Sequence, residues 1–233
     1  MTVADFALQL KTETKKSHTA AENTKFVGSF LRGVVSKESY KQLVANFYFI
    51  YRAMEEELDK LKEDPIISKI SFEALNRTES LAQDCRYYYG PNWRDLITPS
   101  EACQRYVNRI REVAEDDPEL LVGHHYTRYL GDLSGGQILK NIAQNALQPR
   151  DGEGLKFYDF PRIDNAKEWK VKYRSTLDTL ELDQSQVDAL IAEANNAFRL
   201  NMLLFDELKG NASKSLFKVI IGFVKSKLSG ENK

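Results

Sequence analysis

The chain has 233 residues, and its 33 basic and 34 acidic side chains give a formal charge of −1. That balance does not favour nucleic acid as a partner, so any anionic ligand has to be bound by a local cluster of cations. Hydrophobic residues make up 42% of the sequence, which is ordinary for a globular protein that buries a substantial core.

The two cysteines, Cys85 and Cys103, lack the spacing of a metal motif and form no evident disulfide framework, which favours a reducing compartment. The N-terminal segment carries acids and no continuous apolar run, unlike a secretory signal. No stretch approaches the roughly 20 apolar residues that span a bilayer. We therefore expect a cytoplasmic protein that does not cross a membrane.

Between sparse glycines and prolines, apolar residues recur at spacings of three and four, which is typical of helices packed on a core. The pattern predicts an all-α fold, a single compact domain of about eight helices without an internal repeat. The expected helices cover residues 3–23, 24–31, 36–61, 71–88, 98–115, 116–147, 164–180 and 183–208. The longest expected loop covers residues 149–161.

Side chains with capping chemistry stand at the start of four of these helices. The predicted N-caps are Ser36, Thr98, Asp164 and Asp183. Pro99 and Glu101 follow Thr98 in the spacing of a capping box, and Gln186 has the same relation to Asp183. Gly210 and Asn211 are expected to end the last helix of the domain.

The remaining segment, residues 211–233, is a basic amphipathic tail in which apolar residues and lysines are mixed between Ser213 and Leu228. A helix of this kind can lie on a membrane surface. The simpler interpretation is a helix docked on the domain or a loosely ordered end.

The stretch from His124 to Gln137, HHYTRYLGDLSGGQ, is the least ordinary in the chain. Its flanks indicate a buried helix, yet it holds Gly131, Gly135 and Gly136, each of which costs about 1 kcal/mol relative to alanine. It also holds Asp132, and an unpaired buried carboxylate is costly. One interpretation is a kinked helix whose bare backbone lies against a flat ligand, with Asp132 beside it. The other is close helix–helix packing through small residues.

The first helix carries a second unusual group. Lys11, Lys15, His18 and Glu22 are spaced by four, three and four residues, so they share one face of the helix. A single helical histidine is usually a surface or core residue, but imidazole is also a good axial ligand for iron. The lysines can bind anionic groups of the same ligand, and Glu22 can hold the second imidazole nitrogen through a water or a backbone group. A ligand that offers iron, a flat face and two carboxylates is heme.

Two further patterns suit such a ligand. Lys170 and Arg174 lie four residues apart on one expected helix, where they are either a solvated charge pair or a clamp for carboxylates. Phe198, Asn201 and Phe205 recur at spacings of three and four on a later helix. The phenylalanines are most simply core residues, and the asparagine between them requires a hydrogen-bond partner.

Together these motifs resemble those of the heme oxygenase family. Residues 15–23, KKSHTAAEN, resemble its proximal-histidine segment, and residues 126–137, YTRYLGDLSGGQ, resemble its long and specific distal-helix signature. The cationic pair and the phenylalanine–asparagine pattern follow in the family's order. The resemblance covers roughly residues 5–210 and is to the soluble members of bacteria, cyanobacteria and plastids, without the membrane anchor of microsomal members.

The resemblance implies that residues 1–210 form a catalytic domain. Heme b, both cofactor and substrate, would lie between a proximal N-terminal helix and a kinked, glycine-rich distal helix. The implied reaction opens heme at the α-meso carbon with O2 and electrons from a reductant such as ferredoxin, giving biliverdin IXα, carbon monoxide and Fe(II). A bilin reductase that acts on the product is a further expected partner, and the protein is expected to be a monomer.

The resemblance also implies roles for individual residues. His18 is the expected axial ligand of the iron, with Glu22 beside it. The expected catalytic residues are Asp132, Gly131, Gly135, Gly136, Tyr51, Arg128 and Asn201. The glycines would let the distal backbone press on the heme, and Asp132 would hold ordered water that supplies protons. The other expected heme-binding residues are Lys11, Lys15, Tyr126, Lys170, Arg174, Phe198 and Phe205, of which the cations and Tyr126 would anchor the propionates.

Two other functions stay open at the level of sequence. A heme binder or carrier without turnover would need His18 and the cations, but neither Asp132 nor the glycines. A purely structural, partner-binding helical protein would form no stoichiometric heme complex.

Overall fold

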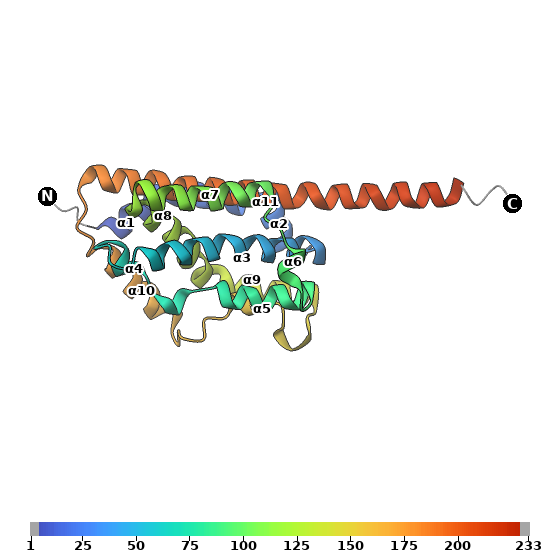
Figure 1. The fold of residues 1–233 in the computed structure, drawn as a ribbon, viewed down its shortest axis with the longest axis horizontal. Coiled ribbons are helices and arrows are strands. Elements are labelled where there is room, and N and C mark those ends of the chain that lie inside the picture. Colours follow the sequence, from blue (N-terminus) through green and yellow to red (C-terminus); the bar gives the residue numbers. More distant parts are fainter. Residues whose placement is uncertain (1–4, 229–233) are drawn as a thin grey trace.

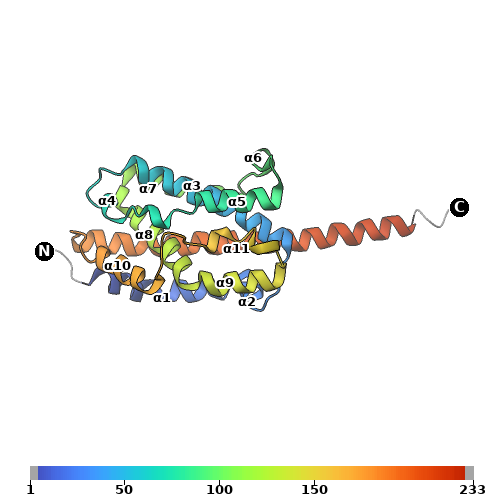
Figure 2. The ribbon, with the colours of Figure 1, turned by 90° about the horizontal axis from the view of Figure 1, so that it is seen from below.

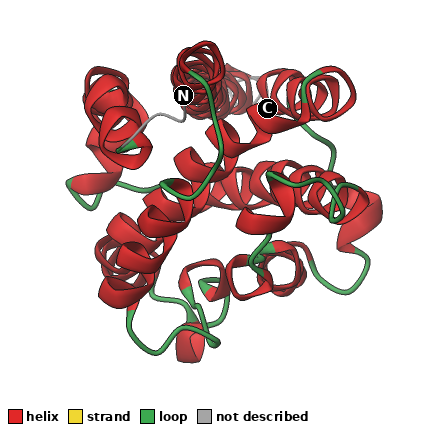
Figure 3. Ribbon diagram, turned by 90° about the vertical axis from the view of Figure 1, so that its left-hand side faces the viewer, coloured by secondary structure: helices red, strands yellow, loops and turns green. Residues whose placement is uncertain are grey.

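The computed structural model describes residues 5–228, and it describes side chains as far as Leu208. Within this part the chain is helical throughout, with no strand (Figure 3). The main helices are α1 (Phe6–Glu22), α2 (Lys25–Leu31), α3 (Lys37–Lys60), α5 (Thr78–Tyr89), α7 (Glu101–Asp116), α8 (Leu121–His125), α9 (Gly131–Leu147), α10 (Ala166–Leu177) and α11 (Gln184–Leu228) (Figure 1). The all-α prediction is confirmed.

Shorter turns complete the described chain. Two single-turn helices, α4 (Ile67–Ile70) and α6 (Trp93–Leu96), were not expected from the sequence. The 3-10 turns are η1 (Glu73–Leu75), η2 (Pro118–Leu120), η4 (Arg150–Gly152) and η5 (Lys156–Tyr158), and η3 (Tyr126–Leu130) is a π-helical turn between α8 and α9. If α8, η3 and α9 are taken as one interrupted helix, the longer helices of residues 5–228 match the eight that the periodicity predicts.

The helices form two sides with α11 between them. Figure 2 shows α1, α2, α9 and α10 along one side and α3, α5 and α7 along the other. α11 packs on α1, α2, α3, α7 and α8, and α3 packs on α5 and α7. This arrangement puts the first helix and the glycine-rich helix α9 on the same side of the molecule.

α3 supplies much of the core. Its predicted apolar stripe is buried at every position: Tyr40, Leu43, Val44, Phe47, Ile50, Tyr51, Met54 and Leu58. Each such side chain contributes about 1.5–3 kcal/mol when fully buried, so the stripe fixes the rotation of α3 about its axis. The rotation in turn points Tyr51 toward α9.

Two of the four predicted N-caps are confirmed. The Ser36 hydroxyl accepts a hydrogen bond from the backbone N–H of Ser39 at 3.1 Å. Asp183 and Gln186 form a reciprocal capping box: the Asp183 carboxylate accepts from the Gln186 N–H at 2.9 Å, and the Gln186 side chain accepts from the Asp183 N–H at 3.0 Å.

The other two predicted N-caps are wrong by one or two residues. Ser100, not Thr98, caps α7, because its hydroxyl accepts a hydrogen bond from the Cys103 N–H. The Asn46 side chain holds Ser100 in place: it accepts from the Ser100 N–H and donates to the Ser100 hydroxyl. Asn165, not Asp164, caps α10 by accepting from the N–H groups of the second and third following residues at 3.0 and 3.2 Å. Neighbouring residues of equal capping chemistry compete, and at α7 the tertiary contact with Asn46 favours Ser100.

Two predicted helix boundaries are also wrong. The helix expected to begin at residue 71 begins at Thr78, where the carboxylate of Glu55 on α3 accepts from the N–H groups of Arg77 and Thr78. The helix expected to end at Gly210 continues to Leu228 and runs past the rest of the molecule (Figure 1). One glycine costs a helix only about 1 kcal/mol, which a long helix can absorb. The predicted amphipathic character of residues 211–233 lies outside the described side chains.

Within the described residues, no helix combines the length and apolar character needed to cross a membrane.

Candidate active site

The predicted interruption of the central helix lies just before the glycines and not at them. The π-helical turn Tyr126–Leu130 separates α8 from α9, and Gly131 opens α9 with ordinary helical dihedral angles, φ −62° and ψ −49°. An inserted π-turn re-aims the side chains that follow it, and such turns occur often at functional sites. The turn itself carries Arg128, and Asp132 follows in the first turn of α9.

The space around the glycines distinguishes the two interpretations of this helix. A Cβ added at Gly131 or Gly135 would meet no atom of the described residues within 4 Å, and one added at Gly136 would make ordinary contact with Tyr158 at 3.5 Å. At Gly123 the same atom would lie 2.9 Å from the backbone nitrogen of Ala194 on α11. Close helix packing therefore explains Gly123, but it does not explain Gly131 or Gly135.

A buried polar network lies beside these glycines. Arg128 donates from Nε to the Tyr51 hydroxyl at 2.9 Å and from Nη1 to Oδ1 of Asn201 at 2.6 Å. The Tyr51 hydroxyl donates in turn to Oδ2 of Asp132, and Nη2 of Arg128 lies 3.7 Å from Oδ1 of the same carboxylate. The structure thus brings together four of the predicted catalytic residues from α3, η3, α9 and α11.

Burial controls the charges in this network. Burial raises the pKa of Asp132 above its ordinary value, although the charge of Arg128, the hydrogen bond from Tyr51 and the charge of Arg77 all lower it. Burial also raises the pKa of Tyr51 well above its usual range, so the phenol stays neutral and can donate. Burial alone would lower the pKa of Arg128, but Tyr51 and Asp132 more than offset it, and the guanidinium stays charged. The Asp132 side chain is 12% exposed and can exchange protons with solvent molecules.

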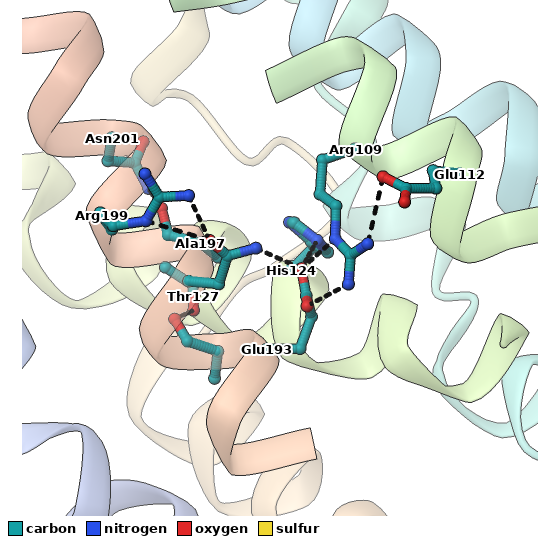
Figure 4. A network of polar contacts seen from close by, with 10 residues as sticks. Arg109, Glu112, His124, Thr127, Glu193, Ala197, Arg199 and Asn201 are labelled. Atoms are coloured by element: carbon teal, nitrogen blue, oxygen red, sulfur yellow. Dashed lines mark hydrogen bonds and ion pairs between the residues drawn. The ribbon is translucent and has the colours of Figure 1, made fainter. Parts of the chain in front are cut away.

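The three histidines lie in different environments. His124 and His125 are buried, and each has a partner: Nε2 of His124 lies 2.9 Å from the Glu193 carboxylate, and Nδ1 of His125 lies 2.7 Å from the Tyr173 hydroxyl (Figure 4 shows His124 and Glu193). Burial lowers the pKa of His125 to about 3, which keeps it neutral. The side chain of His18 is 55% exposed. Of the three, His18 alone is accessible to a ligand.

Contacts with α11 and α10 hold α1 in the orientation that exposes His18. The Ser17 hydroxyl donates to Oδ1 of Asn195 on α11 at 2.5 Å, and the Asp178 carboxylate after α10 accepts from the N–H of Ala7 in the first turn of α1. The His18 ring meets the edge of Phe198 with centroids 5.8 Å apart. Oε2 of Glu22 lies 3.6 Å from Nδ1 of His18, so the predicted neighbour is in place.

The predicted cations lie on two neighbouring helices, α1 and α10. Lys11 and Lys15 are exposed on α1, and Lys170 and Arg174 are half-buried on α10. Tyr126 of η3 interacts with both helices: burial raises the pKa of its hydroxyl, and Thr14 of α1 and the charge of Arg174 on α10 lower it. Among the described residues, none of the four cations has a carboxylate within 4 Å. Four positive charges on these two helices are therefore available to an anionic ligand.

On α11, the three residues Phe198, Asn201 and Phe205 lie in two different environments. Phe198 contacts His18, and Asn201, one turn later, belongs to the network of Arg128, so α11 connects the two predicted halves of the site. Phe205 stacks on Phe26 of α2 with centroids 5.7 Å apart, away from that network. Phe205 lies where it packs α2 on α11, and its part in ligand binding stays a prediction.

Several residues of the site were not predicted from the sequence. The guanidinium of Arg128 lies 4.3 Å from the centroid of the Phe47 ring, and Phe157 of η5 packs against the Tyr51 ring at 5.5 Å. The position of Phe47, one turn before Tyr51 on the buried stripe of α3, is a signal that could have indicated its role. Phe157 has no such signal, because it comes from a loop more than a hundred residues later.

Comparisons with known proteins identify the family. A sequence model described as heme oxygenase matches residues 4–207. The chain is 54% identical over 213 residues to heme oxygenase 1 of Nostoc, with 91% of this chain and 90% of the relative covered. The chain belongs to the heme oxygenase family. A second cyanobacterial relative, heme oxygenase 1 of Synechocystis, is 54% identical over 212 residues, with 91% of this chain and 88% of the relative covered.

Solved structures of the family share the fold. The crystal structure of heme oxygenase-1 from the cyanobacterium Synechocystis in complex with heme superposes with a TM-score of 0.89 at 52% identity, over 94% of this chain and 99% of that one. Heme oxygenase-2 from Synechocystis, in complex with heme and NO, gives a TM-score of 0.89 at 43% identity, over 91% and 88% of the two chains. The predicted family, the predicted fold and the prediction of an enzyme of this family are confirmed. The roles of individual residues stay predictions.

Proposed function

We propose that this protein binds heme b and opens it oxidatively to biliverdin, carbon monoxide and ferrous iron, with O2 and electrons from an external reductant. One observation carries the proposal: two helical glycines face open space directly beside a buried, hydrogen-bonded Asp132. A helix that only packed or carried a ligand has no need of that combination. Cyanobacterial relatives named heme oxygenase support the same reaction.

The residues of this chain fit heme in three ways. His18 is an exposed imidazole on a rigid helix, suited to be an axial ligand of iron. The unpaired cations of α1 and α10 are suited to the two propionates. The bare backbone at Gly131 and Gly135 leaves room for a flat ring. When bound, heme supplies the iron that activates O2 and the ring carbon that is oxidised.

On the proximal side the protein positions the imidazole of His18. Glu22 lies beside Nδ1 of His18, so Nε2 is the nitrogen left for the iron. A carboxylate at this distance favours the tautomer with the proton on Nδ1 and makes Nε2 a better donor. The edge contact with Phe198 and the hydrogen bond between Ser17 and Asn195 limit rotation of the ring.

On the distal side the protein holds and moves protons. Arg128 donates a hydrogen bond to the Tyr51 phenol, and that phenol donates a hydrogen bond to Oδ2 of Asp132. Oδ1 of Asp132 is then the oxygen that can bind a solvent molecule next to Gly131. Because burial raises the pKa of this carboxyl, it can take up and release a proton closer to neutral pH than an exposed aspartate. The network supplies protons from a fixed direction and does not crowd the ring.

The cations determine which edge of the heme faces Asp132. Lys11, Lys15, Lys170 and Arg174 would hold the propionates on the side of α1 and α10, with Tyr126 between them. Holding the propionates would fix the rotation of the ring and would so determine which meso carbon is oxidised. With the full predicted set in place, we propose cleavage at the α-meso carbon and biliverdin IXα as the product.

The electron donor and later partners are proposed on chemical grounds. Lys11, Lys15 and Lys16 are exposed on one helix of the site and suit an acidic donor protein such as ferredoxin. A bilin reductase would consume the product. The catalytic unit is proposed to be residues 1–210 of a monomer acting in the cytoplasm.

A single-turnover assay tests the function. The protein is mixed with one equivalent of hemin, and ferredoxin, ferredoxin reductase and NADPH are added in air. Loss of the heme absorption, release of carbon monoxide and biliverdin IXα identified by chromatography are expected. A stable one-to-one complex that yields neither biliverdin nor carbon monoxide, with ferredoxin or with ascorbate, would instead support a heme carrier.

A further inference from the structure

Arg77, between η1 and α5, is a buried cation without an ion-pair partner. Arg77 is 3% exposed, and among the described residues no carboxylate lies within 4 Å of its guanidinium, although Glu55 accepts a hydrogen bond from its backbone N–H. Its guanidinium donates instead to the backbone carbonyls of Leu75, at 2.9 Å, and of Phe157 and Asp159, and it lies 3.9 Å from the centroid of the Phe160 ring. Burying a charge whose hydrogen bonds all go to carbonyls is costly.

The carbonyls that Arg77 holds belong to the segment that supports the distal network. Phe157 packs against the rings of Tyr51 and Phe47 with centroids 5.5 and 5.3 Å apart, and Tyr158 lies next to Gly136. The same segment is held at its N–H groups by Asp84, which accepts from Lys156 and Phe157 at 2.8 Å. Asp84 alone would fix the start of the segment, whereas Arg77 fixes its end.

The charge of Arg77 also acts on Asp132. The two groups interact electrostatically, and Arg77 and Arg128 are the two cations that favour the ionised form of this carboxylate. Nη2 of Arg128 lies 3.7 Å from the carboxylate, whereas Arg77 interacts with it electrostatically without forming an ion pair within 4 Å. The other groups that interact with Asp132 are the phenols Tyr51, Tyr106, Tyr129 and Tyr158. Each of these is buried and neutral, so none replaces the second positive charge.

We propose that Arg77 is a positioning residue of the distal network, which clamps the Phe157–Asp159 backbone against Tyr51 and supplies a second positive charge for the Asp132 carboxylate. This inference rests on the proposed role of Asp132 in proton delivery. The simpler explanation is a loop staple with no influence on Asp132. The two differ in what happens when the charge is removed but the hydrogen-bond donors are kept.

The test measures the titration of Asp132 in the heme-free protein, so that it does not depend on turnover. The ¹³C signal of the Asp132 carboxyl is assigned by comparison with Asp132→Asn and followed against pH in three variants. Arg77→Gln keeps donors for the carbonyls and removes the charge. Arg77→Lys keeps the charge and loses the planar fork. Arg162→Met removes an exposed arginine paired with Glu73, and serves as the control.

In Arg77→Gln the pKa of Asp132 is expected to rise by about one unit, a tenfold change in proton affinity. In Arg77→Lys and Arg162→Met the pKa of Asp132 is expected to stay close to that of the parent protein. In Arg77→Gln the pH profile of the single-turnover rate should shift toward higher pH. An unchanged titration in Arg77→Gln, or equal shifts in the Gln and Lys variants, would show that Arg77 is only a loop staple. If the parent protein forms no biliverdin, the proposed function fails, whatever the titration shows.

Discussion

The phenol of Tyr51 on α3 donates a hydrogen bond to the carboxylate of Asp132 on α9, across 81 residues of sequence. The same phenol accepts from Arg128 at 2.9 Å, so the orientation of Asp132 depends on two other elements of the fold. The phenol binds Oδ2 of the carboxylate, whereas Oδ1 lies 3.7 Å from Nη2 of Arg128 and accepts no hydrogen bond from the described residues. The direction of the proposed proton supply is therefore set by the hydrogen bond between Tyr51 of α3 and Asp132 of α9.

Asp132→Ala is expected to leave heme binding nearly unchanged and to divert turnover away from biliverdin. The carboxylate lies beside the ligand space and not among the cations that would bind the propionates, so its loss removes proton supply and not affinity. Heme affinity is measured by absorption titration, biliverdin by chromatography, and oxidation of an added phenol reports the expected gain of peroxidase activity. Ser134→Ala, an exposed change on the same helix, is the control. A normal biliverdin yield from Asp132→Ala would contradict the assigned role.

His18→Ala is expected to abolish the axial bond and nearly all turnover. Because His124 and His125 are buried with their own partners, neither can replace the lost imidazole. The absorption and resonance Raman spectra of the heme complex should change, and added imidazole should restore the parent spectrum. Lys16→Ala, an exposed neighbour, should leave the spectrum unaltered. An unchanged spectrum in His18→Ala would show that another residue binds the iron.

Gly135→Ala is expected to stabilise the heme-free protein and to weaken heme binding. The added methyl group meets no described atom within 4 Å and improves helix propensity by about 1 kcal/mol, but it occupies the space proposed for the heme. Overpacking against a ligand costs about 1–3 kcal/mol, which is about 5- to 150-fold in Kd. Thermal unfolding without heme and absorption titration with heme measure the two effects.

Gly123→Ala provides the contrasting case for that experiment. Its methyl group would lie 2.9 Å from the backbone nitrogen of Ala194, so the heme-free protein should lose about 1–3 kcal/mol of stability. If Gly135→Ala destabilised the heme-free protein as Gly123→Ala does, both glycines would serve helix packing.

Glu193→Gln is expected to lower stability at neutral pH, with a difference that shrinks in acid. Burial raises the pKa of Glu193, but the hydrogen bonds from His124 and Arg109 outweigh it and bring the pKa from 4.5 to about 2 (Figure 4). Because the folded-state pKa lies below the unfolded one, this stabilisation is complete above about pH 4.5 and is lost as the pH falls toward 2. The shift corresponds to about 3 kcal/mol.

Urea unfolding of the parent protein and Glu193→Gln at pH 7, 4.5 and 3.5 measures the effect. Glu101→Gln, which removes an exposed partner of Arg105, is the control and should change stability little at any pH. A Glu193→Gln difference that stayed constant between pH 7 and 3.5 would contradict the pKa shift.

Local sequence patterns predicted most of the helices and the residues proposed for the site. The periodicity of three and four identified the apolar stripe of α3, and the same spacing put Lys11, Lys15, His18 and Glu22 on one face of α1. The capping box of Asp183 and Gln186 was predictable because both partners lie within one turn. The signature around Asp132 was sufficient to indicate the family. These features depend on residues close together in the chain, where helical geometry alone sets the distances.

The tertiary structure decided every question that involves residues far apart in sequence. It showed that Gly123 packs against α11 while Gly131 and Gly135 face open space, although all three look alike in the sequence. It paired His124 and His125 with buried partners and left His18 exposed. The start of α5 depends on a hydrogen bond to Glu55 of α3, and the orientation of the Asp132 carboxylate depends on a hydrogen bond from Tyr51. Neither could be predicted from the neighbouring sequence. The physical reason is that the packing of helices against one another sets the burial and the hydrogen-bond partners of each side chain. Burial and partners in turn determine which groups are free to bind a ligand and how strongly they hold a proton.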